Sequence, residues 1–298
     1  MKSGFITILG RPNAGKSTLL NCILRDKIAI TSHKAQTTRN AILGIYNDNE
    51  YQLIFVDTPG IHEAKSYLGI YMNKEAMSQV EGADAILYII DGKKGIQDED
   101  IETLKKVNSY DIPVILVVNK IDEISKDRLL SRLIFADNKY KFEEIVPISA
   151  LNSENVEELL NVCKKYANDN VQYYPNNTKT NTNINFQIAE IIREKIIINT
   201  EKEVPHLIAC KVDDIKEKTS KVYIQASIIC NKQTHKAIII GKSGTMLKKI
   251  NEQSCNDISK IFNKKIVLSL FVKVEEDWLN SQKQLFNLGY FSGDKDEW

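Results

Sequence analysis

The feature that most constrains this chain is an octapeptide at residues 10–17, which follows an apolar run at 5–9 and precedes a helical pattern at 18–24. Its residues are Gly10, Arg11, Pro12, Asn13, Ala14, Gly15, Lys16 and Ser17. The spacing G-x-x-x-x-G-K-S between a strand and a helix aims backbone N–H groups and a helix N-terminus at phosphate oxygens. We expect Lys16 to reach the β and γ phosphates of a nucleotide and Ser17 to ligate magnesium.

A second motif, Asp57-Thr58-Pro59-Gly60, follows the apolar run at 51–56. Its position predicts a carboxylate at the end of a strand beside the phosphate loop, where Asp57 would hold magnesium directly or through water. The N–H of Gly60 is then the expected contact to the γ-phosphate. In isolation the same tetrapeptide would be an ordinary turn, so the prediction depends on its spacing from the phosphate loop.

A third motif ends the apolar run at 114–118 and contains Asn119, Lys120 and Asp122. A carboxylate at Asp122 that accepts from the ring N–H and the exocyclic amino group of guanine would reject adenine, which offers neither donor. A fourth, weaker signal follows the run at 144–148, where the backbone of Ser149, Ala150 and Leu151 is placed to contact the guanine carbonyl oxygen.

Short β-rich apolar runs alternate with amphipathic helical patterns from residue 5 to about residue 167. This alternation predicts a doubly wound α/β sheet with mostly parallel strands, in a domain spanning 1–167. Residues 168–183 are rich in Asn and Thr and have no apolar period, so we expect a linker there. Residues 286–298 are interpreted as a solvated C-terminal tail.

The segment 184–285 predicts a smaller α+β domain with a helix at 186–198, strands at 206–212 and 222–230, a helix from Thr245 to Phe262, and a strand at 265–274. Before the second helix lies a G-x-x-G turn with a cation inside it, formed by Gly241, Lys242, Ser243 and Gly244. A nucleic-acid backbone approaches such a turn closely. The element order resembles a type II KH domain.

The charge distribution agrees with a nucleotide-binding first domain and a nucleic-acid-binding second domain. Residues 184–285 contain 17 Lys and Arg against 12 Asp and Glu, a net charge of +5, although the whole chain carries only +1. If nucleic acid binds, we expect RNA rather than DNA, at the second domain. The five cysteines are scattered and no apolar window has the length of a membrane span, so a cytoplasmic protein with reduced thiols is expected.

The four nucleotide motifs resemble the G1, G3, G4 and G5 motifs of regulatory GTPases. That resemblance makes residues 31–39 the first switch loop, with Thr38, or else Thr37, closing onto magnesium and the γ-phosphate. Ile61 stands where many such enzymes have a water-orienting glutamine, and an apolar side chain cannot hydrogen-bond water. Slow intrinsic hydrolysis is therefore expected, with Lys16, Thr38 and Gly60 as the catalytic groups.

Two residues leave alternatives open. Asn13 matches an asparagine that is associated with a bound K⁺ in related GTPases with an apolar residue at the glutamine position, but it is also a residue that shapes turns. His62 is a candidate base, yet a switch-loop histidine without a visible partner is more commonly solvated.

Taken together, the chain is similar to the bacterial Era family, in which a GTPase domain precedes a KH domain. Further matching segments are Gln36–Arg39, residues 190–195 (E-I-I-R-E-K) and residues 288–290 (L-G-Y). The resemblance implies GTP and GDP as substrate and product, Mg²⁺, binding near the 3′ end of 16S ribosomal RNA, a role in 30S subunit assembly, a monomer, and weak peripheral contact with the inner membrane.

Three other functions remain to be weighed. A metabolic P-loop kinase is disfavoured by the guanine motif, and a double-GTPase ribosome factor by the single set of nucleotide motifs. The third is an interaction protein acting mainly at the membrane. Amphipathic segments such as 131–135 (S-R-L-I-F) are instead interpreted as the core faces of helices.

Overall fold

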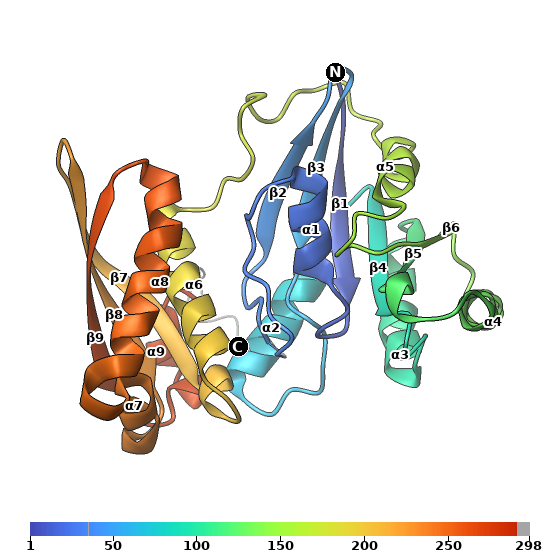
Figure 1. Ribbon diagram of the computed structural model, residues 1–298. Helices are drawn as coiled ribbons and strands as arrows, with labels where there is room; N and C mark the ends of the chain where they lie inside the picture. Colours follow the sequence, from blue (N-terminus) through green and yellow to red (C-terminus); the bar gives the residue numbers. More distant parts are fainter. Residues whose placement is uncertain (35, 291–298) are drawn as a thin grey trace. The chain divides into compact units, whose positions relative to one another are not determined.

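The computed structural model describes residues 1–34 and 36–290. The chain divides into two compact units (Figure 1). The first contains residues 1–64 and 69–181, and the second contains the chain from Thr182 onward together with residues 65–68.

The first unit is built on a six-stranded sheet in the order β2-β3-β1-β4-β5-β6. All neighbouring strands are parallel except β2 and β3, which are antiparallel. The strands are β1 (Lys2–Gly10), β2 (Ile42–Asn47), β3 (Tyr51–Asp57), β4 (Ala85–Asp91), β5 (Val114–Asn119) and β6 (Glu144–Pro147). The predicted mostly parallel α/β fold is confirmed. Because β1, β3, β4 and β5 are parallel, the loops after them meet at one edge of the sheet.

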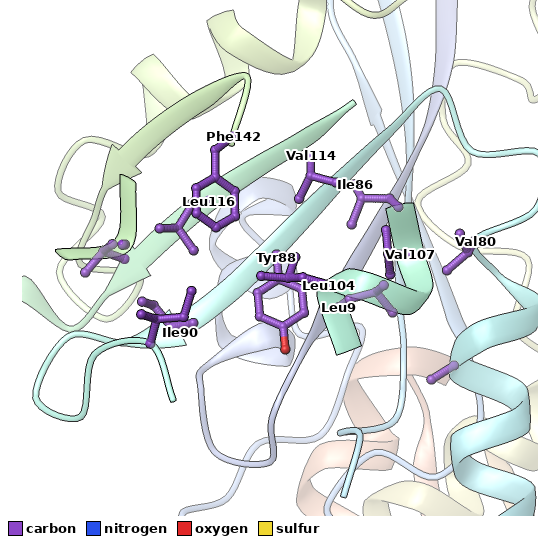
Figure 2. Packing of buried hydrophobic residues seen from close by; sticks show 14 residues of the cluster. Leu9, Val80, Ile86, Tyr88, Ile90, Leu104, Val107, Val114, Leu116 and Phe142 are labelled. Atoms are coloured by element: carbon purple, nitrogen blue, oxygen red, sulfur yellow. The ribbon is translucent and has the colours of Figure 1, made fainter. Parts of the chain in front are cut away.

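Helices cover both faces of this sheet. Helices α1 (Lys16–Leu24) and α5 (Val156–Lys164) pack on one face. Helices α2 (Tyr67–Ser78), α3 (Asp98–Val107) and α4 (Lys126–Asp137) lie on the other, where Figure 2 shows side chains of β4, β5 and α3 packed together. Val114, Ile86 and Leu104 are almost completely buried in this cluster. Burying such side chains stabilises the layered arrangement by roughly 1.5–3 kcal/mol each.

Helix α4 corrects one expectation. Within the segment 131–135, Leu133 packs against the core cluster, but Ile134 and Phe135 are 55% and 46% exposed, as is Leu130 at 59%. The segment is therefore not simply the core face of a helix, because apolar residues occupy both sides of α4. Among the described residues, no helix has the length and apolar character needed to cross a membrane.

The predicted linker is not a free connection over most of its length. Asp169 pairs with Ser3 near the start of β1, and the side chain of Gln52 accepts hydrogen bonds from the backbone N–H groups of Tyr173 and Tyr174 at 2.8 and 2.9 Å. The backbone N–H of Ile45 donates to the carbonyl oxygen of Lys179 at 2.8 Å. Residues 168–181, which we call the strap, thus follow the sheet of the first unit. Local composition cannot reveal this, because the partners lie more than 100 residues away.

The second unit has a three-stranded sheet in the order β7-β8-β9, with β7 and β8 antiparallel and β8 and β9 parallel. Its elements are α6 (Ile184–Asn199), β7 (Ile208–Glu217), β8 (Lys221–Cys230), α7 (Gln233–Ile240), α8 (Thr245–Phe262), β9 (Lys265–Val274) and α9 (Gln282–Asn287). The sequence interpretation missed α7, since its run of three isoleucines is more typical of a strand. Contacts with α8 and β9 stabilise it as a helix.

The C-terminal boundary also needs correction. Helix α9 crosses the predicted start of the tail at residue 286. Tyr290 is only 6% exposed and stacks on the buried indole of Trp278, with ring centroids 6.2 Å apart. The packed part of the second unit therefore extends at least to Tyr290, and residues 291–298 of the predicted tail lie outside the described residues.

Candidate functional site

The phosphate loop joins β1 to α1 and requires unusual backbone angles. Gly10, Asn13 and Gly15 have φ values of 141°, 65° and 101°. Such angles are costly for most residues but accessible to glycine and tolerated by asparagine. A Cβ on Gly15 would lie 2.1 Å from the side-chain nitrogen of Asn119, so space as well as dihedral angle excludes a side chain there.

Lys16 begins α1 and is 6% exposed. Its ammonium group donates to the carbonyl oxygens of Gly10 and Arg11 at 2.9 and 3.0 Å, which holds the cation inside the loop. Burial lowers the pKa of Lys16 to about 8, while the negative charge of Asp57 opposes that shift. A buried cation at the N-terminus of a helix is suited to bind a polyanion.

Ser17, Thr38 and Asp57 come from three different elements and converge beside Lys16. The hydroxyl of Ser17 donates to Oδ2 of Asp57 at 2.6 Å and lies 2.7 Å from the hydroxyl of Thr38. The Thr38 hydroxyl donates to the same carboxylate oxygen at 3.4 Å. The switch threonine preferred from the sequence therefore lies at this site. The Thr37 hydroxyl instead donates to the carbonyl oxygen of Lys34 at 2.7 Å.

This cluster fits a magnesium ion. Asp57 is completely buried, and its Oδ1 has no hydrogen-bond partner among the described residues. Burial raises the pKa of Asp57 to about 6, although the charge of Lys16 and the two hydroxyl donors oppose the shift. A buried carboxylate oxygen without a partner is costly in protein alone. Two hydroxyls and a carboxylate are the hard oxygen ligands that Mg²⁺ prefers.

Gly60, the last residue of the motif that begins at the end of β3, lies against the phosphate loop. A Cβ at residue 60 would lie 2.7 Å from the backbone nitrogen of Pro12 and 2.8 Å from its Cα. The hydroxyl of Thr58 donates to the carbonyl oxygen of Ile8 at 2.7 Å. The backbone N–H of Ile61 donates to the carbonyl oxygen of Gly10 at 3.3 Å. The two motifs are thus held at backbone contact distance.

His62 is not a solvated side chain. One ring nitrogen, Nδ1, lies 2.8 Å from the carbonyl oxygen of Gly60, and the other, Nε2, lies 3.0 Å from the side-chain nitrogen of Gln36. An Nδ1–H tautomer satisfies both contacts, since it donates to Gly60 and accepts from Gln36. With both nitrogens engaged, this conformation leaves no nitrogen available to take a proton from water.

Asn119 connects three of the four nucleotide motifs. Its side-chain nitrogen donates to the carbonyl oxygen of Ala14 at 2.8 Å, and its side-chain oxygen accepts from the backbone N–H groups of Lys120 and Ala150 at 2.8 and 3.0 Å. All these contacts form within the protein, and Asn119 is only 2% exposed. Its position therefore indicates that it holds the phosphate loop and the two guanine loops in register.

The other residues of the two predicted guanine-binding motifs lie near Asn119. Lys120 has a φ of 64°, and its ammonium group pairs with the Asp91 carboxylate at 2.7 Å. Burial by itself would raise the pKa of Asp91, but the hydrogen bond and positive charge of Lys120 hold that pKa below its usual value. Asp122 is exposed in the turn that follows. Ser149 is completely buried, whereas Leu151 is 76% exposed.

A cavity of about 290 Å³ lies between α1, residues 26–27 and the loop at 150–153. Thr18, which follows the last residue of the phosphate motif, and Ala150, from the fourth motif, both line it. The structure thus brings residues separated by more than 130 positions to one cavity at the carboxyl edge of the sheet.

In the second unit, Gly241 to Gly244 form the turn between α7 and α8. Gly241, Ser243 and Gly244 have φ values of 74°, 50° and 77°. A Cβ on Gly241 would lie 2.6 Å from the Cβ of Met246, whereas a Cβ on Gly244 would meet nothing within 4 Å. Gly241 is therefore required for packing, and Gly244 leaves open space in front of the α8 N-terminus. Lys242 and Ser243 are exposed there.

The segment E-I-I-R-E-K lies in α6 and contains a buried ion pair. The guanidinium of Arg193 donates twice to the carboxylate of Glu190, at 2.7 and 2.6 Å, and Arg193 is completely buried. Although burial opposes the charged form, Glu190 keeps the pKa of Arg193 above its usual value. The neighbouring Lys195 pairs with Glu194 and with Asp257 of α8. These buried charged residues lie inside the domain and form no surface for ligands.

Comparison with known proteins agrees with both units. A family model described as a 50S ribosome-binding GTPase matches residues 5–120, and a KH domain model matches residues 203–279. GTPase Era of Clostridium kluyveri is 46% identical over 291 residues, covering 97% of this chain and 99% of the relative. This chain belongs to the Era family of GTPases. GTPase Era of Clostridium acetobutylicum is 44% identical over 289 residues, covering 97% and 98%.

Solved Era structures have the same fold. A crystal structure of Era in complex with MgGDPNP and nucleotides 1506–1542 of 16S ribosomal RNA matches with a TM-score of 0.95 and 39% identity. It covers 97% of this chain and 99% of the Era chain. A variant of Aquifex aeolicus Era bound to GDP·AlF4⁻ matches with the same TM-score, identity and coverage.

Sequence reasoning overlooked two residues of this Era-family site. Asp91 ends β4 and is paired in register with Asn119 of β5, so a carboxylate at the end of a central strand was the signal that could have found it. Asn21 lines the cavity from the second turn of α1. Sequence pattern alone carries no signal for Asn21, because its partners are backbone groups of a loop.

Proposed function

We propose that this protein binds GTP with Mg²⁺ and hydrolyses it slowly to GDP and phosphate. The observation that carries this function is the convergence of Ser17, Thr38 and Asp57 beside the buried cation of Lys16. These groups come from a helix, a loop and a strand end, and each has the chemistry that a nucleotide triphosphate with its metal ion requires.

Individual residues have separate roles in this proposal. The loop N–H groups and Lys16 bind the β and γ phosphates, and the N–H of Gly60 contacts the γ-phosphate from the opposite side. Thr38 closes the switch loop over the site. Asp122 accepts hydrogen bonds from guanine. When bound by Ser17, Thr38 and Asp57, with Asp57 direct or through water, Mg²⁺ neutralises charge on the phosphate oxygens.

Competition binding with GTP and ATP tests the nucleotide class. We expect the protein to prefer GTP by roughly a hundredfold or more, because ATP would leave the Asp122 carboxylate without donors. Equal affinity for GTP and ATP would instead favour a metabolic P-loop kinase and reject the assignment.

We also propose that K⁺ assists hydrolysis at Asn13. The residue has a left-handed backbone conformation inside the phosphate loop, and an apolar residue, Ile61, follows Gly60 where a polar water-orienting side chain would otherwise stand. A cation beside the phosphates would supply charge stabilisation that the protein lacks there. GTP turnover is measured in KCl and NaCl for the unmodified protein and for Asn13→Ala. Equal rates in all four conditions would contradict K⁺ assistance.

For the second unit, we propose binding to small-subunit ribosomal RNA near its 3′ end, in assistance of 30S subunit assembly. The support is the Era complex with nucleotides 1506–1542 of 16S ribosomal RNA, together with the exposed turn at 241–244 and the positive charge of the unit. Lys242 and the α8 N-terminus would face phosphate.

Crosslinking of the GTP-bound protein in cell extract, followed by sequencing of attached RNA, tests this role. Gly244→Asp adds a negative charge at the open face of the turn and should abolish recovery of 16S RNA. Gly289→Asp is the matched control, because Gly289 also has a positive φ, 81°, and open space for a Cβ. Undiminished recovery after Gly244→Asp, or an equal loss after both changes, would reject the turn as the RNA contact.

A further inference from the structure

Residues 26–30 connect the end of α1 to the switch loop, and Asn21 holds them in place. The side-chain oxygen of Asn21 accepts from the backbone N–H groups of Ile28 and Ala29, both at 2.9 Å, and its side-chain nitrogen donates to the carbonyl oxygen of Ala29 at 2.7 Å. The backbone oxygen of Asn21 also accepts from the N–H of Asp26 at 3.2 Å. One side chain thus makes three hydrogen bonds to a segment with no regular secondary structure.

This segment forms one wall of the cavity at the nucleotide site. Asp26 and Lys27 line the cavity on one side, and Ala150 and Leu151 of the fourth nucleotide motif line it on the other. Asn21 and Thr18 line it from α1. Any displacement of residues 26–30 away from α1 would therefore widen the cavity on the side opposite the guanine loop.

The strap holds the same segment from outside. The ammonium group of Lys179 donates to Oδ2 of Asp26 at 2.8 Å, while the carbonyl oxygen of Lys179 accepts from the N–H of Ile45 in β2. The hydrogen bond from Lys179 also holds the pKa of Asp26 below its usual value. Asp26 precedes the switch loop and β2 follows it. Lys179 consequently contacts the chain on both sides of the switch loop.

We propose that Asn21 and Lys179 are positioning residues that hold residues 26–30 as a wall of the nucleotide pocket and thereby set the rate of guanine-nucleotide release. The inference rests on the proposed GTP binding and adds that residues 26–30 control how fast the nucleotide is released. Asn21 fixes the wall to α1. Lys179 fixes it to the strap, whose C-terminal end leads directly into the second unit at Thr182.

The two contacts differ in strength. Asn21 is partly buried and makes three hydrogen bonds, and removing it leaves backbone groups of Ile28 and Ala29 without their partner. The Lys179–Asp26 pair is exposed, at 52% and 46% of the two side chains. Exposed ion pairs contribute little. Loss of Asn21 should therefore accelerate release much more than loss of Lys179.

The experiment measures dissociation of a fluorescent N-methylanthraniloyl GDP from the full chain by stopped flow, chased with excess GDP. Asn21→Ala should raise the dissociation rate by roughly tenfold or more, because several partly buried hydrogen bonds are lost. Lys179→Met should raise it by roughly two- to fivefold, as expected for an exposed ion pair. The matched controls are Asn161→Ala, an exposed helical asparagine in α5, and Lys165→Met, which removes the exposed pair with Glu144. Both controls should release GDP at the unmodified rate.

Conservative variants separate positioning from general destabilisation. Asn21→Asp keeps the acceptor for Ile28 and Ala29 and should retain part of the slow release, and Lys179→Arg should restore it fully. If Lys179 acts through Asp26, the double variant Asp26→Asn/Lys179→Met should release GDP no faster than the faster single variant.

The outcomes distinguish failure of this inference from failure of the proposed GTPase function. If the unmodified protein does not bind the fluorescent GDP, the proposed GTPase function fails. If it binds and Asn21→Ala and Lys179→Met both release GDP at the unmodified rate, only the wall inference is overturned. It is also overturned if the controls accelerate release as much as Asn21→Ala does. Because Lys179→Met alters an exposed side chain, its result stands even where Asn21→Ala fails to fold.

Discussion

The side-chain nitrogen of Asn119 donates a hydrogen bond of 2.8 Å to the carbonyl oxygen of Ala14, a residue 105 positions earlier in the chain. Asn119 belongs to the guanine motif and Ala14 to the phosphate loop. The same side chain also accepts from the N–H of Ala150. The phosphate and guanine halves of the site are therefore held together by protein contacts.

We predict that Asn119→Ala weakens both the fold and nucleotide binding. The change leaves buried groups of Ala14 and Ala150 without a partner, which should lower the free energy of unfolding by about 1–3 kcal/mol. Urea unfolding of the nucleotide-free protein, followed by far-UV circular dichroism, measures this. Asp122→Ala is the comparison, since Asp122 is exposed and its loss should weaken GTP binding while leaving stability within about 0.5 kcal/mol. Equal stability of the two variants would contradict the bridging role of Asn119.

Asp122→Asn should change which base is bound. The carboxylate accepts two hydrogen bonds, whereas an amide accepts one and donates one. Guanine offers two donors at that edge, but xanthine offers one donor and one carbonyl acceptor. Competition binding should show that the variant prefers xanthosine triphosphate over GTP by roughly tenfold or more. An unaltered preference for GTP would mean that Asp122 does not contact the base.

Asp57→Asn should remove the dependence of nucleotide binding on magnesium. Chelation of Mg²⁺ should accelerate GDP release from the unmodified protein by roughly tenfold or more, because charge-assisted contacts are lost. The variant should release GDP rapidly with or without the chelator. Asp48→Asn serves as control, because Asp48 is a carboxylate paired with Lys164 in the turn before β3, whereas Asp57 lies at the opposite end of that strand. A full chelator response in Asp57→Asn would exclude Asp57 as a metal ligand.

Arg193→Met should destabilise the second unit. It leaves the Glu190 carboxylate buried without its bidentate partner, which should cost about 3–5 kcal/mol. Trp278 is buried in this unit, so the change in its fluorescence during urea unfolding reports this unit. The double variant Glu190→Gln/Arg193→Met should recover most of the loss, because no uncompensated charge remains. If the double variant is as unstable as Arg193→Met alone, packing of the arginine rather than charge pairing is decisive.

Many elements could be predicted because their signals are local. The predicted helix from Thr245 to Phe262 and strand at 265–274 have the bounds found in the structure, since a turn with glycines precedes the helix and apolar periodicity continues through both. The phosphate and guanine motifs could be located for a similar reason. Each lies at the end of an apolar strand, and parallel strands bring their carboxyl ends to one edge.

Other features depend on residues distant in sequence. The strap packs along the first unit because Gln52 of β3 and Ile45 of the edge strand β2 offer hydrogen-bonding groups, and nothing in its own composition predicts that. The three exposed apolar residues of α4, Leu130, Ile134 and Phe135, are as apolar as buried ones, and only packing decides which side is covered. Gln36 engages His62 across a gap of 26 residues.

The sequence by itself determined most of the element types, α7 excepted, and the chemistry of each motif, because backbone periodicity, glycine turns and side-chain functional groups are properties of short segments. Only the tertiary structure decided how those groups act together. Asn119 bonds to Ala14, Asn21 holds residues 26–30, and Lys179 reaches Asp26 because chain folding brings these atoms within hydrogen-bond distance. Such contacts depend on three-dimensional proximity, which no local pattern encodes.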